Sequence, residues 1–119
     1  MLAKTNRLTK KKDFDAVWQK GRSSFAKIIG VKILANGLEE SRFGIMVGLK
    51  VSKKAVERNK IKRRIREIIR LEALNLKNGF DIAITVMPAA RGLEFNELRG
   101  ALVFNFKRLG ILRAESKKL

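Results

Sequence analysis

Ten lysines and arginines lie between residues 50 and 70, against two glutamates, and these cations have the clearest chemistry in the chain. A guanidinium offers a planar fork of N–H donors to phosphate oxygens, and an ammonium is a compact point charge. At about 100° per residue, one arc of a helix would collect five polar side chains of this run: Asn59, Lys62, Arg63, Arg66 and Arg70. The spacing predicts a surface that binds successive phosphates of a polyanion.

A run of charge is often only a solvated helix face, whose cations pair with acids one turn away. Glu57 and Glu67 are too few to neutralise ten cations, and like charges one turn apart destabilise a helix unless an external anion meets them. The apolar residues follow a separate stripe, which we expect to face a sheet: Ile61, Ile65, Ile68 and Leu76. This helix is therefore predicted to bind nucleic acid.

The composition indicates one basic domain. The chain has 119 residues, a formal net charge of +17 and 45% hydrophobic residues, enough to form a core. We expect a single RNA-binding domain over residues 1–119, with a flexible basic arm at 1–8 and a flexible tail at 114–119. Histidine and cysteine are absent from the sequence, which excludes thiol catalysis, disulfides and zinc fingers. No apolar run approaches 18 residues and no signal-like N-terminus is present, so we expect a cytoplasmic protein without a membrane partner.

Hydrophobic periodicity places the basic run between strands of a sheet. Helices are predicted at residues 10–20, with Thr9 as N-cap, at 53–76 and at 94–109, and strands within 25–35, 42–48 and 80–87. The predicted fold class is α+β, a two-layer sandwich. It has an N-terminal helix, a mixed sheet of about four strands, a long basic helix crossing between strands, and a C-terminal helix.

The two faces of the predicted sheet differ. Alternation within 42–48 and 80–87 gives one apolar face and one face of small, polar or flexible residues, which we expect to be open or only partly covered. Glycines on that second face would let an RNA backbone approach closely, or would mark strand bends: Gly30, Gly44 and Gly48.

Residues 56–67, VERNKIKRRIRE, resemble the Arg-Asn-Arg signature helix of the bacterial ribonuclease P protein subunit. The flanking segments resemble the same family, and the resemblance extends from residue 7 to residue 109. The matching flanks are Arg7-Leu8, Phe14 with Trp18, Gly21-Arg22-Ser23, and residues 44–47 followed by Lys50.

The resemblance implies an accessory subunit of the endoribonuclease ribonuclease P, which removes the 5′ leader of precursor tRNA and forms the mature 5′ end. In that family RNA is the catalyst, with Mg²⁺ held by the RNA, so we expect no catalytic residue, metal ligand or cofactor in the protein. The implied partners are the catalytic RNA and precursor tRNA, in a complex of one protein and one RNA. The lack of histidine, cysteine and clustered carboxylates independently disfavours a protein-only nuclease.

The resemblance and the helical arc together give ten candidate contacts with the catalytic RNA. Lys60 replaces the second arginine of the signature, which keeps the charge but removes the bidentate fork. The ten are Lys50, Lys53, Lys54, Arg58, Asn59, Lys60, Lys62, Arg63, Arg66 and Arg70.

The resemblance also implies a leader-binding cleft between the N-terminal helix and the sheet. The candidates are Arg7, Phe14, Trp18, Lys27 and Lys32. Phe14 and Trp18 either pack in the core or stack on a base, which is worth roughly 1–3 kcal/mol. Many family members have aromatic residues at the positions of Ile29 and Lys32, so we expect a more electrostatic cleft here, through Lys27 and Lys32.

Two other functions use the same chemistry. A ribosomal or other structural RNA-binding protein with a similar sandwich remains an alternative. A DNA-binding protein is disfavoured because the sequence lacks dimerising or helix-turn-helix spacing.

Overall fold

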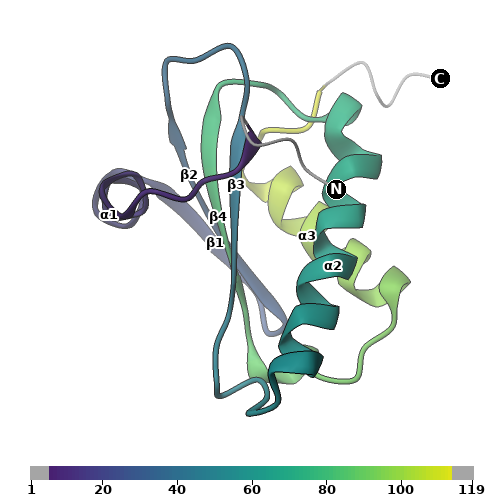
Figure 1. Ribbon diagram of the computed structural model, residues 1–119. Coiled ribbons are helices and arrows are strands. Elements are labelled where there is room, and N and C mark those ends of the chain that lie inside the picture. Colours follow the sequence, from purple (N-terminus) through teal and green to yellow (C-terminus); the bar gives the residue numbers. More distant parts are fainter. Residues whose placement is uncertain (1–5, 114–119) are drawn as a thin grey trace, which may run out of the picture.

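A mixed sheet separates one helix from two others in the computed structural model, which describes residues 6–113 (Figure 1). The helices are α1 (Lys11–Lys20), α2 (Ala55–Glu72) and α3 (Phe95–Arg108), with 3₁₀ turns η2 (Ala73–Asn75) and η3 (Pro88–Ala90). The strands are β1 (Arg22–Phe25), β2 (Ile29–Ala35), β3 (Arg42–Val47) and β4 (Phe80–Val86). The predicted α+β sandwich with a four-stranded mixed sheet is confirmed.

The strand order explains the position of α2. The sheet runs β1-β2-β4-β3, with antiparallel pairing of β1 with β2 and of β2 with β4, and parallel pairing of β3 with β4. Parallel neighbours need a crossover connection, and α2 is that crossover, as the sequence predicts.

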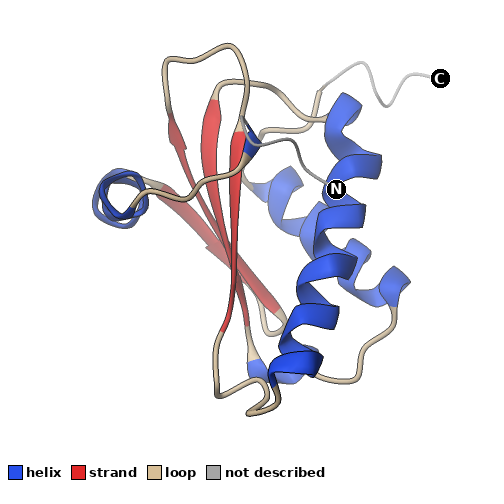
Figure 2. Ribbon diagram, in the orientation of Figure 1, coloured by secondary structure: helices blue, strands red, loops and turns tan. Residues whose placement is uncertain are grey.

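The main core lies between the sheet and the pair α2 and α3 (Figure 2). Strand alternation turns Ile82 and Ile84 of β4 towards these helices, and both are fully buried. The helices contribute apolar stripes that are buried against the sheet: Ile61, Ile65, Ile68 and Ile69 of α2, and Leu98, Leu102 and Phe106 of α3. The predicted isoleucine stripe is therefore the anchor of α2.

Helix α1 partly covers the other sheet face, through a smaller cluster of Leu8, Val17 and Ala83. Two glycines of that face lie beneath phenylalanine rings. A Cβ added to Gly44 would lie 2.3 Å from Phe14 Cζ, and one added to Gly30 would lie 2.3 Å from Phe25 Cδ2. At both positions the close approach predicted for RNA is taken by an aromatic side chain of the protein.

Several boundaries differ from the prediction. The basic helix begins at Ala55, not at residue 53, and passes into η2 after Glu72. The predicted strand region 25–35 is a hairpin, because β1 ends at Phe25 and β2 starts at Ile29. The N-cap of α1 is Lys10 and makes no side-chain cap, so the prediction of Thr9 was wrong.

The described part of the predicted N-terminal arm lies along β3. Arg7 forms a parallel bridge with Phe43, and the Leu8 N–H donates to Phe43 O at 2.8 Å. Leu8 is buried, so this part of the arm is held by the sheet. Residues 1–5 of the arm and the predicted tail at 114–119 lie outside the described residues. Between residues 6 and 113, no helix combines the length and hydrophobicity needed to cross a bilayer.

Candidate nucleic-acid interface

The outward side of α2 carries cations that have no partner among the residues that the structure describes. Because the isoleucine stripe is buried, four predicted RNA contacts lie on the outward side and one flank: Asn59, Lys62, Arg63 and Arg66. Within residues 6–113, none of these four side chains makes a hydrogen bond or ion pair with another protein group. Unpaired cations this close together favour binding of an external anion.

Two arginines of the predicted surface are engaged within the protein. Arg70 forms a bidentate pair with Glu67, with Nε–Oε1 at 3.0 Å, and this bond lowers the pKa of the Glu67 carboxyl. Arg58 is half-buried, and its Nη1 donates to Ser52 O at 3.0 Å. Arg58 therefore holds the loop before α2 in place as well as carrying charge. Arg70, whose charge is already paired with Glu67, is the member of the predicted arc least available to bind RNA.

The loop before α2 is fixed around the buried hydroxyl of Ser52. That hydroxyl donates to Glu57 Oε1 and accepts the Lys54 N–H at 3.1 Å. Its bond to Glu57 is the main cause of a lowered pKa of the Glu57 carboxyl, and Arg91 adds a smaller effect. The three predicted lysine contacts of this loop are exposed: Lys50, Lys53 and Lys54.

A hollow of about 300 Å³ lies where α1, β3 and α2 meet, and we call it the α1–β3 hollow. Phe14 forms part of its wall, Gly44 lies beneath the Phe14 ring, and Arg66 reaches the hollow from α2. The remaining lining residues are Arg7, Leu8, Thr9, Phe43 and Ile45. The hollow thus joins predicted leader contacts, Arg7 and Phe14, to the basic face of α2.

Phe14 and Trp18 differ in their surroundings. Phe14 is half-buried, packs on Gly44 of the sheet and lines the α1–β3 hollow. Trp18 packs on the Leu8–Val17–Ala83 cluster and is not among the residues that line the hollow. Lys32 Nζ donates to Trp18 O and lies 5.5 Å from the Trp18 ring centroid. Lys32 is therefore engaged at the C-terminal end of α1, where a cation also favours the helix dipole.

An exposed aromatic residue that the sequence did not identify lies on the same sheet face. Phe25 of β1 pairs in register with Gly30 of β2, and its ring covers that glycine while the residue stays 48% exposed. Nearby, Lys27 is exposed in the β1–β2 turn. This face of the sheet thus gains an exposed ring from β1, a placement that only the hairpin register reveals.

Helix α1 is tied to the sheet by an arginine between two aspartates. Arg42 Nη1 lies 3.3 Å from Asp13 of α1, and Arg42 Nη2 lies 2.6 Å from Asp81 of β4. The bond to Asp81 is the main cause of a raised pKa of Arg42. The position of α1, and with it the wall of the α1–β3 hollow, is therefore fixed by charge as well as by packing.

The acids of the described chain do not form a metal site. In residues 6–113, no three of the histidine, cysteine, aspartate or glutamate side chains are grouped so that they could hold an ion.

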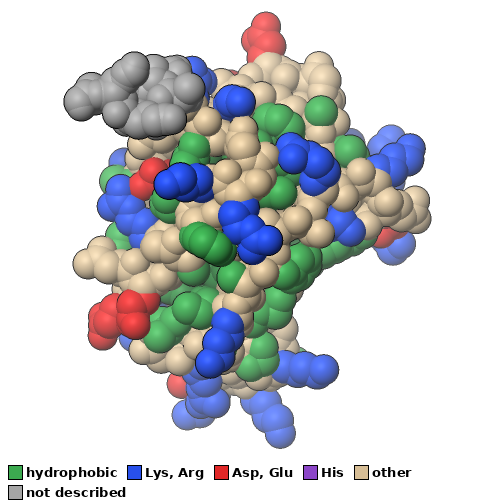
Figure 3. Space-filling model, turned by 180° about the vertical axis from the view of Figure 1, so that it is seen from behind, with side chains coloured by type: hydrophobic (Ala, Val, Ile, Leu, Met, Phe, Trp, Pro, Cys, Tyr) green, Lys and Arg blue, Asp and Glu red, His purple; other side chains and the backbone are tan. Residues whose placement is uncertain are grey.

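Viewed from behind, over α3 and β1, the surface carries many lysines and arginines and only a few acids (Figure 3). Positive charge therefore also lies on this face, apart from the basic run of residues 50–70.

The sequence and the fold match one family. Residues 2–110 match the ribonuclease P family. The chain is 38% identical over 112 residues to the ribonuclease P protein component of Synechocystis sp., covering 93% of this chain and 90% of that protein. It is 40% identical over 113 residues to the component of Cyanothece sp., covering 82% and 86%.

Solved structures give the same result. The ribonuclease P protein of Staphylococcus aureus superposes with a TM-score of 0.83 at 28% identity, covering 91% of this chain and 98% of that one. The protein of Thermotoga maritima superposes with a TM-score of 0.79 at 33% identity, covering 86% and 96%. With a family match over almost the whole sequence and relatives of nearly equal length, the chain belongs to the ribonuclease P protein family.

Proposed function

We propose that this protein is the cytoplasmic protein subunit of ribonuclease P, in a complex of one protein and one catalytic RNA. In this proposal α2 binds the catalytic RNA, and the complex removes the 5′ leader from precursor tRNA. The main support is the outward side and one flank of α2, where four side chains have no protein partner within residues 6–113: Asn59, Lys62, Arg63 and Arg66. Each cation that replaces a counterion on a phosphate contributes affinity that falls with salt.

The chemistry of cleavage is assigned to the RNA. Mg²⁺ bound by the RNA would supply the metal-ion chemistry, and the protein would contribute charge and position. The side chains of α2 would lower the repulsion between the two RNAs and reduce the Mg²⁺ concentration that the complex needs. The exposed lysines of the preceding loop would add contacts of the same kind: Lys50, Lys53 and Lys54.

The leader is proposed to cross the α1 side of the sheet. The α1–β3 hollow offers the Phe14 ring and the Arg66 guanidinium to one nucleotide, with Arg7 beside them. Phe25 offers a second ring on the same face, and Lys27 lies close to it in sequence. Rings that stack on bases and cations that follow the backbone are the usual means of binding a single strand.

The direct test is reconstitution with catalytic RNA and precursor tRNA at a Mg²⁺ concentration too low for the RNA alone. The proposal expects the protein to restore cleavage at the mature 5′ end. If cleavage is no faster than with RNA alone, the proposal fails, and a structural RNA-binding role becomes the better account.

Leader binding is tested by Phe14→Leu, which keeps an apolar side chain on Gly44. The holoenzyme should lose affinity for precursor tRNA by about fivefold, corresponding to roughly 1 kcal/mol of stacking, with little change for mature tRNA. Phe104→Leu is the matched control, because Phe104 is a half-exposed ring on α3, away from this sheet face. Equal losses for the two tRNAs would assign Phe14 to packing only.

A further inference from the structure

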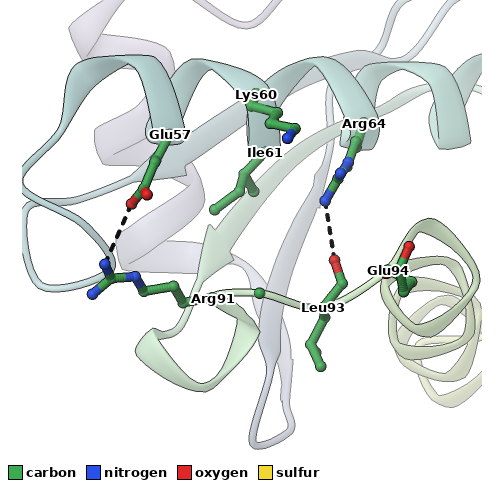
Figure 4. A pocket seen from close by; sticks show the side chains of 8 residues that line it. Glu57, Lys60, Ile61, Arg64, Arg91, Leu93 and Glu94 are labelled. Atoms are coloured by element: carbon green, nitrogen blue, oxygen red, sulfur yellow. Dashed lines mark hydrogen bonds and ion pairs between the residues drawn. The ribbon is translucent and has the colours of Figure 1, made fainter.

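A second basic hollow lies between α2 and the segment 91–94 that leads into α3 (Figure 4). Its volume is about 270 Å³, and three cations line it: Lys60, Arg64 and Arg91. Arg64 and Arg66 are two positions apart and therefore about 200° apart around α2. This α2–α3 hollow consequently lies on the opposite flank of α2 from the α1–β3 hollow.

One cation of this hollow, Arg64, is held in place by the segment before α3. Arg64 is half-buried, and its Nη1 donates to Leu93 O at 3.1 Å, which fixes the guanidinium plane. A guanidinium has five N–H donors, so the bond to Leu93 leaves others for a ligand. Figure 4 shows Lys60 directed towards the Arg64 guanidinium, with no acidic side chain between them. Two like charges therefore line the same hollow, and a bound anion would reduce the repulsion between them.

The two acids that also line the hollow already have partners. Glu57 accepts the Ser52 hydroxyl and lies 3.5 Å from Arg91 Nη2. Glu94 accepts a backbone N–H of the first turn of α3, as half of a capping box with Glu97. Three cations and two acids leave one net positive charge, which one phosphodiester group would neutralise.

We infer that the α2–α3 hollow binds a backbone phosphate of the catalytic RNA. Arg64 and Lys60 are the donors, and Arg91 lies at the rim, where its side chain is 61% exposed. The inference rests on the proposed function and extends it: the RNA contact runs around α2, from the outward face to the flank beside α3. Arg64 and Arg91 join the contact surface, although neither belongs to the predicted arc.

The test measures the affinity of the whole protein for catalytic RNA at 50 and 200 mM KCl. Arg64→Gln removes the charge, and its shorter side chain also gives up the Arg64 Nη1 bond to Leu93 O, so its stability is measured as well. Lys107→Gln removes one charge from an exposed position on α3. Loss of one phosphate contact changes the slope of log affinity against log salt by about 0.9. The ratio of wild-type affinity to Arg64→Gln affinity for the RNA should therefore be about three- to fourfold larger at 50 mM than at 200 mM KCl. Arg91→Gln should show a smaller effect in the same direction, and Lys107→Gln no dependence on salt.

The inference is overturned if the ratio of wild-type affinity to variant affinity for the RNA is equally independent of salt for Arg64→Gln and for Lys107→Gln. Thermal melts of each variant show whether the fold is retained, and the exposed Arg91 gives an independent reading should Arg64→Gln lose stability. The two proposals fail separately. If wild type neither binds the catalytic RNA nor accelerates cleavage, the proposed function falls. If wild type and Arg63→Gln differ in salt slope but Arg64→Gln does not, only this inference falls.

Discussion

At the scale of single residues, the wall of the α1–β3 hollow depends on a glycine beneath a ring. Gly44 has no side chain, so the Phe14 ring lies directly on β3, where an added Cβ would be 2.3 Å from Cζ. The sequence left two roles open for this glycine, close approach of an RNA backbone or a strand bend. In the structure the space above Gly44 is filled by the Phe14 ring. This contact between α1 and β3 is tertiary, so the sequence pattern could not reveal it.

Gly44→Ala is predicted to force Phe14 from its place and to lower the free energy of unfolding by about 1–3 kcal/mol through overpacking. Gly48→Ala is the matched control, because a Cβ added to Gly48 meets nothing within 4 Å. Urea unfolding of both variants measures the difference. Equal stabilities would show that Phe14 can leave Gly44 without cost.

The Glu57 carboxyl provides a second test at this scale. Its pKa lies below the ordinary 4.5, mainly because the Ser52 hydroxyl donates to the carboxylate. A lowered folded-state pKa means that the contact stabilises the fold above pH 4.5 and is lost as pH falls through the folded-state value. Ser52→Ala should raise the Glu57 pKa in an NMR titration and reduce this acid dependence. An unchanged pKa would assign the shift to Arg91 and the neighbouring lysines.

At the scale of elements, α1 is held by contacts distant in sequence. Asp13 of α1 meets Arg42 of β3, and Lys32 of β2 donates to Trp18 O at the other end of the helix. A Cβ added to Gly21, just after α1, would lie 2.5 Å from Val17 O and 2.6 Å from Ile33 O, so the helix end is close to β2. The geometry of the α1–β3 hollow therefore depends on how firmly α1 is held.

Asp13→Asn is predicted to speed amide hydrogen exchange in α1, with a loss on the order of 1 kcal/mol of local stability and little change in β2 and β4. Asp15→Asn is the control, because within residues 6–113 the Asp15 side chain makes only the exposed i, i+4 pair with Lys11. Exchange rates in α1 that are the same in both variants would mean that the Arg42–Asp13 contact does not hold the helix.

Periodic elements were predictable from sequence, and the contacts between them were not. The isoleucine stripe fixes which side of α2 is buried, so the outward cations follow from 3.6-residue periodicity. Strand β1 was missed because its four residues lack an alternating apolar pattern and three of them are exposed. Arg64 was left out of the predicted surface because its role depends on segment 91–94 lying beside α2. The ring of Phe25 over Gly30 likewise follows from hairpin register.

At the scale of the whole molecule, the formal charge of +17 works against the folded state. The core between the sheet and helices α2 and α3 holds the fold together, while unpaired cations on α2 repel one another. Anions that bind the folded form should therefore stabilise it by linkage.

Sulfate or phosphate is predicted to raise the melting temperature more than sodium chloride at equal ionic strength. Each kcal/mol of anion binding should add roughly 4 °C for a domain of this size. Calorimetry or circular dichroism in the matched salts measures the effect. Identical melting temperatures would show that screening alone, without bound anions, accounts for any stabilisation.

If the outward side of α2 binds the catalytic RNA, the affinity of the protein for that RNA depends on salt through the cations of α2. Binding of wild type and of Arg63→Gln to catalytic RNA would be measured over a series of KCl concentrations. The slope of log affinity against log salt is predicted to be shallower for Arg63→Gln by about 0.9, the equivalent of one phosphate contact. Parallel lines for the two proteins would contradict it and leave this face of α2 as solvated charge.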